Sequence, residues 1–158
     1  LKSELEAAGY DVMMFYVHAS LERVLQQNQN RFEKSGGEDR SLAPAIVMRT
    51  WMNVVKNYKP YRDLFGGYAT SKFGLVSNTL DGDKLTNIED IIDKYLTPFK
   101  PTGTKEKTPA QQARSNKQYA EMKDEIQRLL DSKELEDLES DSLSAEEAQM
   151  RINDFLRL

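Results

Sequence analysis

The 158-residue sequence contains no cysteine, and this absence removes several kinds of chemistry at once. Disulfide bridges, thiolate nucleophiles and cysteine-bound zinc are all excluded. A cysteine-free chain also fits the cytoplasm, so we expect a cytoplasmic location. Long apolar runs are missing as well. The longest, Val12 to Val17, is far too short to span a bilayer, and no signal peptide is visible, so we expect no membrane partner.

The short motifs that mark phosphate loops and catalytic centres are absent too. Neither G-x-x-x-x-G-K-[ST] nor G-x-G-x-x-G occurs, and the pairs Gly36-Gly37 and Gly66-Gly67 match neither pattern. No nucleophile elbow is found. The acidic stretch Asp81 to Asp83 lacks the spaced ligands of a calcium loop, and Glu134 to Asp141 is a charge run typical of a solvated face. We therefore expect no metal at either stretch.

Composition predicts a modest core beneath a highly charged surface, because 39% of residues are hydrophobic and 30% are charged. The net charge of −4 does not favour nonspecific binding to nucleic acid or to an acidic membrane. The length suggests one domain with an appendage. Composition changes at the Pro/Gly/Thr/Lys stretch from Lys100 to Lys107, so we predict a domain over residues 1–103 and a helical extension over 104–158.

The apolar run Val12 to Val17 predicts a strand over Tyr10 to Ala19. The run is continuous rather than alternating, which is typical of a strand in a parallel sheet covered on both faces by helices. A second strand is predicted over Lys72 to Leu80, followed by a turn. The pattern therefore predicts an α/β fold that is mostly helical and contains a small parallel sheet.

Capping signals place the helices around these strands. Gly9 follows a first short helix, Ser20 caps the next, and Pro44 suits the first position of a third helix that Pro60 and then Gly66-Gly67 are expected to end. Capping boxes predict three more helices: one from Thr86 with Glu89, a long one over Pro109 to Leu138 opened by Thr108 with Gln111, and a last one opened by Ser144 with Glu147.

Arginines are the strongest candidates for a binding site. They lie on two helices and the loop between them, at Arg23, Arg31, Arg40 and Arg49. Guanidinium groups in such places can converge on a polyphosphate and donate to oxygens that gain charge during phosphoryl transfer. The alternative is that they are solvated helix residues, since arginine is common on helix surfaces.

The single histidine and the aromatic residues have weaker functional interpretations. His18 ends the predicted buried strand, and ligands bind at the carboxyl edge of parallel sheets, so a general base is conceivable there. A structural histidine is the favoured interpretation, because no paired carboxylate lies at an informative spacing. Trp51, Tyr58, Tyr61 and Phe65 have helical or near-helical spacing, which favours core packing over base stacking.

A family resemblance covers Asp11 to Asn78. The matching text is VMMFYVHASLERVLQQNQNRFEKSGGEDRSLAPAIVMRTWMNVVKNYKPYRDLF, followed by FGLVSN. In order and wording it resembles the second half of zeta-toxin-like and related P-loop small-molecule or polynucleotide kinases, many of them phage-encoded. The residues that match the family pattern are Asn28, Arg31, Arg40, Leu42, Pro44, Ile46, Val47, Trp51, Val76 and Asn78. Ser77 stands where the family commonly has aspartate.

The resemblance implies that Arg31 and Arg40 bind ATP phosphates as part of a lid, with Arg49 as a weaker third candidate. The phosphate loop, its lysine, the magnesium-binding hydroxyl and the upstream catalytic acid of the family would all precede Leu1. ATP and Mg²⁺ are therefore expected only in a full-length context, with no cofactor for this chain alone. On this interpretation the chain is the lid-bearing part of a phosphotransferase acting on a nucleotide, nucleotide-sugar or polynucleotide, and it is not competent alone.

The alternative function belongs to a different class. The missing phosphate loop and the polar C-terminal helices also suit a non-enzymatic helical interaction or structural protein, of phage origin, that has kept the kinase scaffold. In either case exposed strand edges and the C-terminal helices are the expected surfaces for self-association or for a partner chain.

Overall fold

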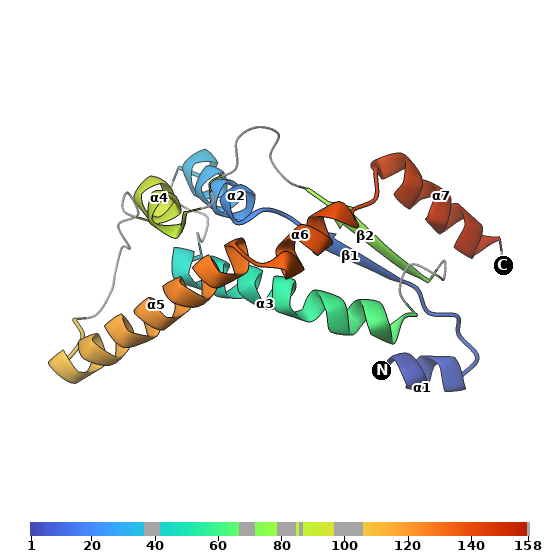
Figure 1. Ribbon diagram of the computed structural model, residues 1–158, viewed down its shortest axis with the longest axis horizontal. Coiled ribbons are helices and arrows are strands. Elements are labelled where there is room, and N and C mark those ends of the chain that lie inside the picture. The colour runs from blue at the N-terminus through green and yellow to red at the C-terminus, as the bar shows by residue number, and fades with distance from the viewer. Residues whose placement is uncertain (37–41, 67–71, 79–84, 86, 97–105, 158) are drawn as a thin grey trace.

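The computed structural model describes residues 1–36, 42–66, 72–78, 85, 87–96 and 106–157 (Figure 1). Its elements are α1 (Lys2–Ala7), β1 (Met14–His18), α2 (Leu21–Lys34), α3 (Pro44–Leu64), β2 (Phe73–Ser77), α4 (Ile88–Ile91), the π-helical turn η2 (Ile92–Leu96), α5 (Pro109–Leu130), α6 (Lys133–Ser140) and α7 (Ala145–Leu156). The predicted fold, mostly helical with a small parallel sheet, is confirmed. No helix in the described ranges is long and apolar enough to cross a membrane.

The sheet consists of β1 and β2, which run parallel with Met14 opposite Phe73 and His18 opposite Ser77. In the described ranges α2 and α3 lie between the two strands in the sequence. Tyr16 and Leu75 are buried on the face that packs against α3 and α6. The predicted burial on both faces is complete on this face and only partial on the other, where Gly74 is buried and Phe15 is half-buried. Because side chains alternate along a strand, Val17 points to the other face, where it is 63% exposed.

The main core lies between α2, α3, α4 and the C-terminal helices, and Trp51 lies inside it. Its fully buried or nearly buried members include Leu21, Leu25, Met48, Trp51, Val55, Ile91, Met122, Ile126 and Leu129. The helices of the predicted extension, residues 104–158, therefore supply part of the same core. In Figure 1, α5 and α6 run beside α3 while the start of α5 projects from one end of the molecule.

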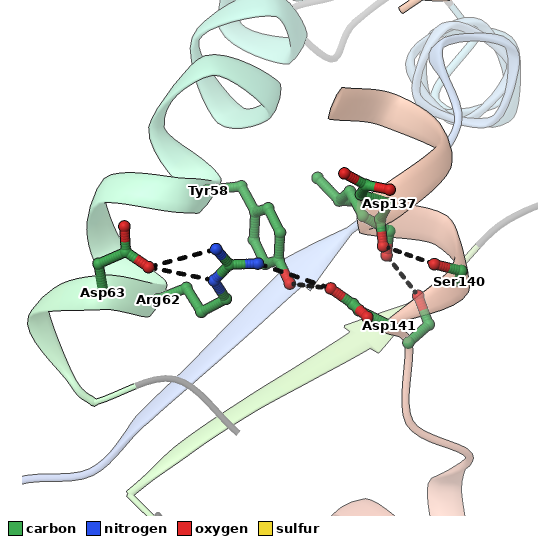
Figure 2. A network of polar contacts seen from close by, with 8 residues as sticks. Tyr58, Arg62, Asp63, Asp137, Ser140 and Asp141 are labelled. Carbon is green, nitrogen blue, oxygen red and sulfur yellow. Dashed lines mark hydrogen bonds and ion pairs between the residues drawn. The ribbon is translucent and has the colours of Figure 1, made fainter. Parts of the chain in front are cut away.

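A second cluster joins the sheet to α3 and α6 through Tyr16, Tyr58, Phe73, Leu75 and Leu138. Figure 2 shows the polar network at its border. The Tyr58 hydroxyl donates to Asp141 Oδ2 at 3.2 Å, and the Arg62 guanidinium lies 5.7 Å from the centre of the Tyr58 ring. These contacts hold the end of α6 on α3, and so position the chain that continues toward Leu143.

The predicted caps at the well-marked helix starts are confirmed. The Ser20 side chain accepts from the Arg23 amide at 3.3 Å. Both predicted C-terminal capping boxes form, at the starts of α5 and α7. Gly9 follows α1 with φ of +87°, a conformation that glycine adopts without the steric cost of a side chain.

Three predicted boundaries are corrected. α3 continues through Pro60, because Pro60 is exposed near the last turns, where water can bond the carbonyl that loses its amide donor. The helix ends at Leu64, just before the second predicted end signal, Gly66, whose φ is +81°. The long helix predicted to Leu138 breaks at Ser132, whose side chain accepts from the Leu135 amide and caps α6. The cap of α4 is Asn87, which accepts from the Glu89 amide, and the predicted cap Thr86 lies outside the described residues.

Candidate functional site

A cleft of about 310 Å³ opens at the carboxyl ends of β1 and β2, between α2 and α3. We call it the carboxyl-edge cleft. It is lined by Val17, His18, Ala19, Val24, Gln27, Leu42, Val47, Thr50, Trp51, Val54 and Asn78. Ligands of α/β proteins bind at this edge of a parallel sheet, because the loops that follow the strands meet there. The cleft is therefore the leading candidate site.

Hydrogen bonds from the walls fix the shape of the carboxyl-edge cleft. The Trp51 indole N–H donates to the Ala19 carbonyl at 3.0 Å, which ties α3 to the end of β1. The Thr50 hydroxyl donates to the Ile46 carbonyl at 2.9 Å, one turn back on the same helix. The spacing of Val47, Thr50, Trp51 and Val54 puts one face of α3 toward the cleft.

His18 lies at the base of the carboxyl-edge cleft and is only 1% exposed. Its carbonyl accepts a hydrogen bond from the Asn78 amide at 2.7 Å, which joins the ends of the two strands. No Asp, Glu, Lys or Arg is among the described residues that line the cleft. A mainly apolar wall with a few amide, hydroxyl and imidazole groups suits a neutral, largely apolar part of a ligand rather than a phosphate.

The Asn28 side chain holds the start of the chain that leads into α3. Its amide nitrogen donates to the Leu42 carbonyl at 2.9 Å, and its oxygen accepts from the Leu42 amide at 3.0 Å. One side chain thereby satisfies both polar groups of a residue that also lines the carboxyl-edge cleft. Leu42 follows Arg40 by two positions in the sequence.

The arginines singled out from the sequence occupy different places. Arg31 is exposed on the last part of α2, three positions after Asn28, so the two share one face of the helix. Arg49 is exposed on α3 but lines a shallow groove with α5 instead of the carboxyl-edge cleft. Arg23 is partly buried, and its Nε has no hydrogen-bond partner in the described part of the chain. Arg40 lies outside the described residues.

The groove beside Arg49 also contains carboxylates, including Glu125. Hydrogen bonds from Arg128 and then from Lys56 lower the pKa of Glu125 to about 2, so it stays ionised. The carboxylates of Glu121 and Glu125 in this groove repel an incoming phosphate. Of Arg31 and Arg49, Arg31 on α2 is consequently the better candidate for an anionic ligand.

An ion pair ties the start of α2 to η2. Lys94 and the Tyr95 hydroxyl both donate to Glu22 Oε1, at 2.7 Å and 2.9 Å. Burial raises the pKa of Glu22, but these hydrogen bonds and the charge of Lys94 outweigh burial and lower the pKa overall. The contact holds the helix that carries Asn28 and Arg31 against the rest of the core.

Comparison with protein-family models, curated proteins and solved structures finds no match to this chain. Within the described ranges, no group of three or more histidine, aspartate or glutamate side chains could hold a metal ion. The description of the carboxyl-edge cleft therefore rests on the residues of this chain alone.

Sequence reasoning missed Gln27 and Thr50 as cleft residues. Each lies at helical spacing from an apolar neighbour, Gln27 after Val24 and Thr50 after Val47. That spacing signals a shared helix face. It does not reveal that the two faces, one on α2 and one on α3, meet across a cavity.

Proposed function

We propose that this chain is the lid-bearing, carboxyl-terminal part of a P-loop kinase-like phosphotransferase that acts on a nucleotide, nucleotide-sugar or polynucleotide. The hydrogen-bonded pair of Asn28 and Leu42 carries the proposal. It holds Leu42 at the rim of the carboxyl-edge cleft and against the α2 face that carries Arg31. Leu42 of this pair follows Arg40 by two positions in the sequence.

The distribution of charge supports different roles for the cleft and for Arg31 beside it. The carboxyl-edge cleft has no ionic side chain among its described lining residues, so it accepts the neutral part of a substrate. Arg31 stands outside it with its guanidinium in solvent, where it can donate paired hydrogen bonds to phosphate oxygens. Phosphoryl transfer depends on such positioned positive charge.

Of the two cofactors expected in a full-length context, only ATP is assigned a binding residue in this chain. Arg31 would hold the phosphates of ATP, which would supply the phosphoryl group in a full-length context. We assign no Mg²⁺ ligand in this chain. Since no phosphate loop with its lysine occurs in the sequence, the 158-residue chain binds ATP weakly and does not turn it over.

Trp51 provides the assay, because it is the only tryptophan and lines the cleft. Titration with ATP should give a saturable change in its fluorescence. Arg31→Ala should weaken this binding about tenfold, as expected for one charge-assisted hydrogen-bonding group, and Arg31→Lys should weaken it less. Arg114→Ala, on the exposed start of α5, is the matched control and should change nothing.

Two results would count against the proposal. ATP turnover by the purified 158-residue chain would show that it is more than a lid-bearing part. A titration that Arg31→Ala and Arg114→Ala weaken equally would remove Arg31 from the phosphate site.

The second candidate function, a helical interaction protein, is favoured by one observation. α7 exposes Met150 and Leu156, which are 57% and 75% accessible, at the end of the molecule that holds the C-terminus (Figure 1). Exposed apolar side chains on an amphipathic helix suit a partner surface. This candidate predicts that ATP leaves Trp51 fluorescence unchanged, whereas the phosphotransferase proposal predicts a saturable change.

A further inference from the structure

A line of three side chains on α2 passes the carboxyl-edge cleft. Gln27 lines the cleft, Arg23 lies one turn before it and Arg31 lies one turn after it. Residues four apart on a helix are neighbours on one face. The three positions therefore form a stripe about 12 Å long, with a guanidinium at each end and an amide at the cleft. We call it the α2 stripe.

Arg23 has donors that the described part of the chain leaves unpaired. Its Nε is buried without a hydrogen-bond partner, and its side chain forms no hydrogen bond or ion pair with the described residues. Leaving a buried donor unpaired is costly, so such a group in a folded protein is normally bonded to water or to a ligand. The Arg23 guanidinium is therefore available to an anion.

The carboxylates of α2 lie off the stripe and are already engaged. Glu22 accepts from Lys94 and from the Tyr95 hydroxyl, at 2.7 Å and 2.9 Å. Glu33 accepts from Gln29 at 2.9 Å. The α2 stripe itself contains no acidic side chain. Its local charge is therefore positive although the whole chain carries −4, and salt confines the effect of more distant charges to about 10 Å.

Positive charge on both sides of Gln27 distinguishes between the three proposed substrate classes. A nucleotide or a nucleotide-sugar carries its phosphates on one side of the nucleoside, so Arg31 alone would serve it. The terminal nucleotide of a strand has its reacting group on one side and, on the other, the phosphate that links it to the next nucleotide. Proteins hold such strands by combining positive charge along the backbone with apolar or aromatic contacts to the bases.

We propose that Arg23 binds the internucleotide phosphate next to the terminal nucleotide of a single-stranded polynucleotide, whose terminal base lies in the carboxyl-edge cleft. Gln27 bonds the polar edge of this base, because an amide side chain both donates and accepts. Arg31 remains on the other side for the phosphates of ATP. This inference rests on the proposed phosphotransferase function and selects the polynucleotide among its three substrates.

Binding is tested with thymidine and with the dinucleotide thymidylyl-thymidine, which adds one internucleotide phosphate. The indole N–H signal of Trp51 in ¹H–¹⁵N spectra reports occupation of the cleft, because Trp51 is the only tryptophan and its N–H is fixed on Ala19. We expect saturable shifts with both ligands, and about tenfold tighter binding of the dinucleotide. Its added affinity should fall as salt rises, whereas thymidine binding should not.

Arg23→Gln should weaken binding of the dinucleotide about tenfold and leave thymidine binding unchanged, since only the phosphate contact is lost. Unchanged thymidine binding also shows that the variant folds. Arg23→Lys keeps the charge and should retain most of the affinity for the dinucleotide. Lys59→Gln removes one positive charge from an exposed site on α3, so it is the matched control and should change neither affinity.

Three results would overturn the inference: a dinucleotide that binds no tighter than thymidine, equal weakening by Arg23→Gln and Lys59→Gln, or weakening by Arg31→Ala in place of Arg23→Gln. If Arg23→Gln does not fold, Arg23→Lys and the salt dependence decide. ATP titration separates this inference from the proposed function. Loss of ATP affinity in Arg31→Ala, without loss of dinucleotide affinity in Arg23→Gln, leaves the phosphotransferase proposal standing and removes the polynucleotide.

Discussion

Replacing Ile126 with alanine tests whether the C-terminal helices belong to the core that supports the cleft. Ile126 is 0% exposed on α5, in the cluster that also contains Trp51. Removal of three buried carbons costs about 2.4 kcal/mol of transfer free energy, and the residual cavity adds about 1 kcal/mol. The better helix propensity of alanine offsets about 0.4 kcal/mol. The net loss of unfolding free energy is therefore about 3 kcal/mol.

The assay is urea unfolding followed by Trp51 fluorescence and by far-ultraviolet circular dichroism. With a slope of about 2 kcal/mol per molar urea, a loss of about 3 kcal/mol lowers the midpoint by roughly 1.5 M. Ile46→Ala is the control, because the same chemical change is made on α3 where the side chain is 51% exposed. Its expected cost is about 1 kcal/mol or less.

One pattern of results would refute the reasoning. If Ile126→Ala leaves the Trp51 transition unchanged while helix content is lost at lower urea, α5 unfolds as a separate unit. The single cooperative transition that we expect requires both signals to move together, since residues of α5 and α3 share one cluster.

Three further predictions concern single side chains. Burial raises the pKa of Tyr16 to about 12, so Tyr16 ionises first in the unfolded state, and the free energy of unfolding falls as pH rises from about 10 toward 12. Tyr16→Phe should remove the last step of the tyrosinate absorbance titration, and an unchanged titration would contradict this. The folded-state pKa of Glu22 is lowered, since bonding to Lys94 outweighs burial, so the stabilisation by ionised Glu22 is present above about pH 4.3 and is lost as pH falls further. Glu22→Gln should therefore reduce the fall of the melting temperature with decreasing pH. A variant whose melting temperature falls with pH as steeply as that of the unaltered chain would refute this. Asn28→Ala should speed hydrogen exchange of the Leu42 amide about tenfold, and equal exchange would show that the pair does not form in solution.

Local chemistry accounts for the parts of the fold that the sequence predicted well. Ser20, Thr108 and Ser144 cap helices because their hydroxyl oxygens reach amides within the same turn, so no distant residue is needed. The small parallel sheet was likewise expected from the continuous apolar run around Met14 and Phe15.

Boundaries were wrong where local signals compete with solvent or with a neighbouring helix. Pro60 removes one amide donor, but its exposed position leaves water to bond the orphaned carbonyl, and α3 continues. Ser132 could extend one helix or cap the next. It caps α6, which lets Leu135 and Leu138 turn into the core.

The candidate site shows the same limit. The sequence identified Arg31, Arg40 and Arg49 as one set, yet the structure places Arg49 in the groove beside α5 and Arg31 beside Asn28 on α2. Helical spacing specifies which residues share a face of one helix. It does not specify which neighbouring element that face meets.

The sequence by itself determined the helices with strong caps, the position of the apolar strand β1 and the absence of a phosphate loop, because these depend on residues close together in the chain. Only the tertiary structure decided that Gln27 and Thr50 face one cleft, that Leu42 is held by Asn28, and that Leu143 occupies the outer edge of β2. Each of these depends on contacts between distant segments, which packing and burial select together and no local pattern encodes.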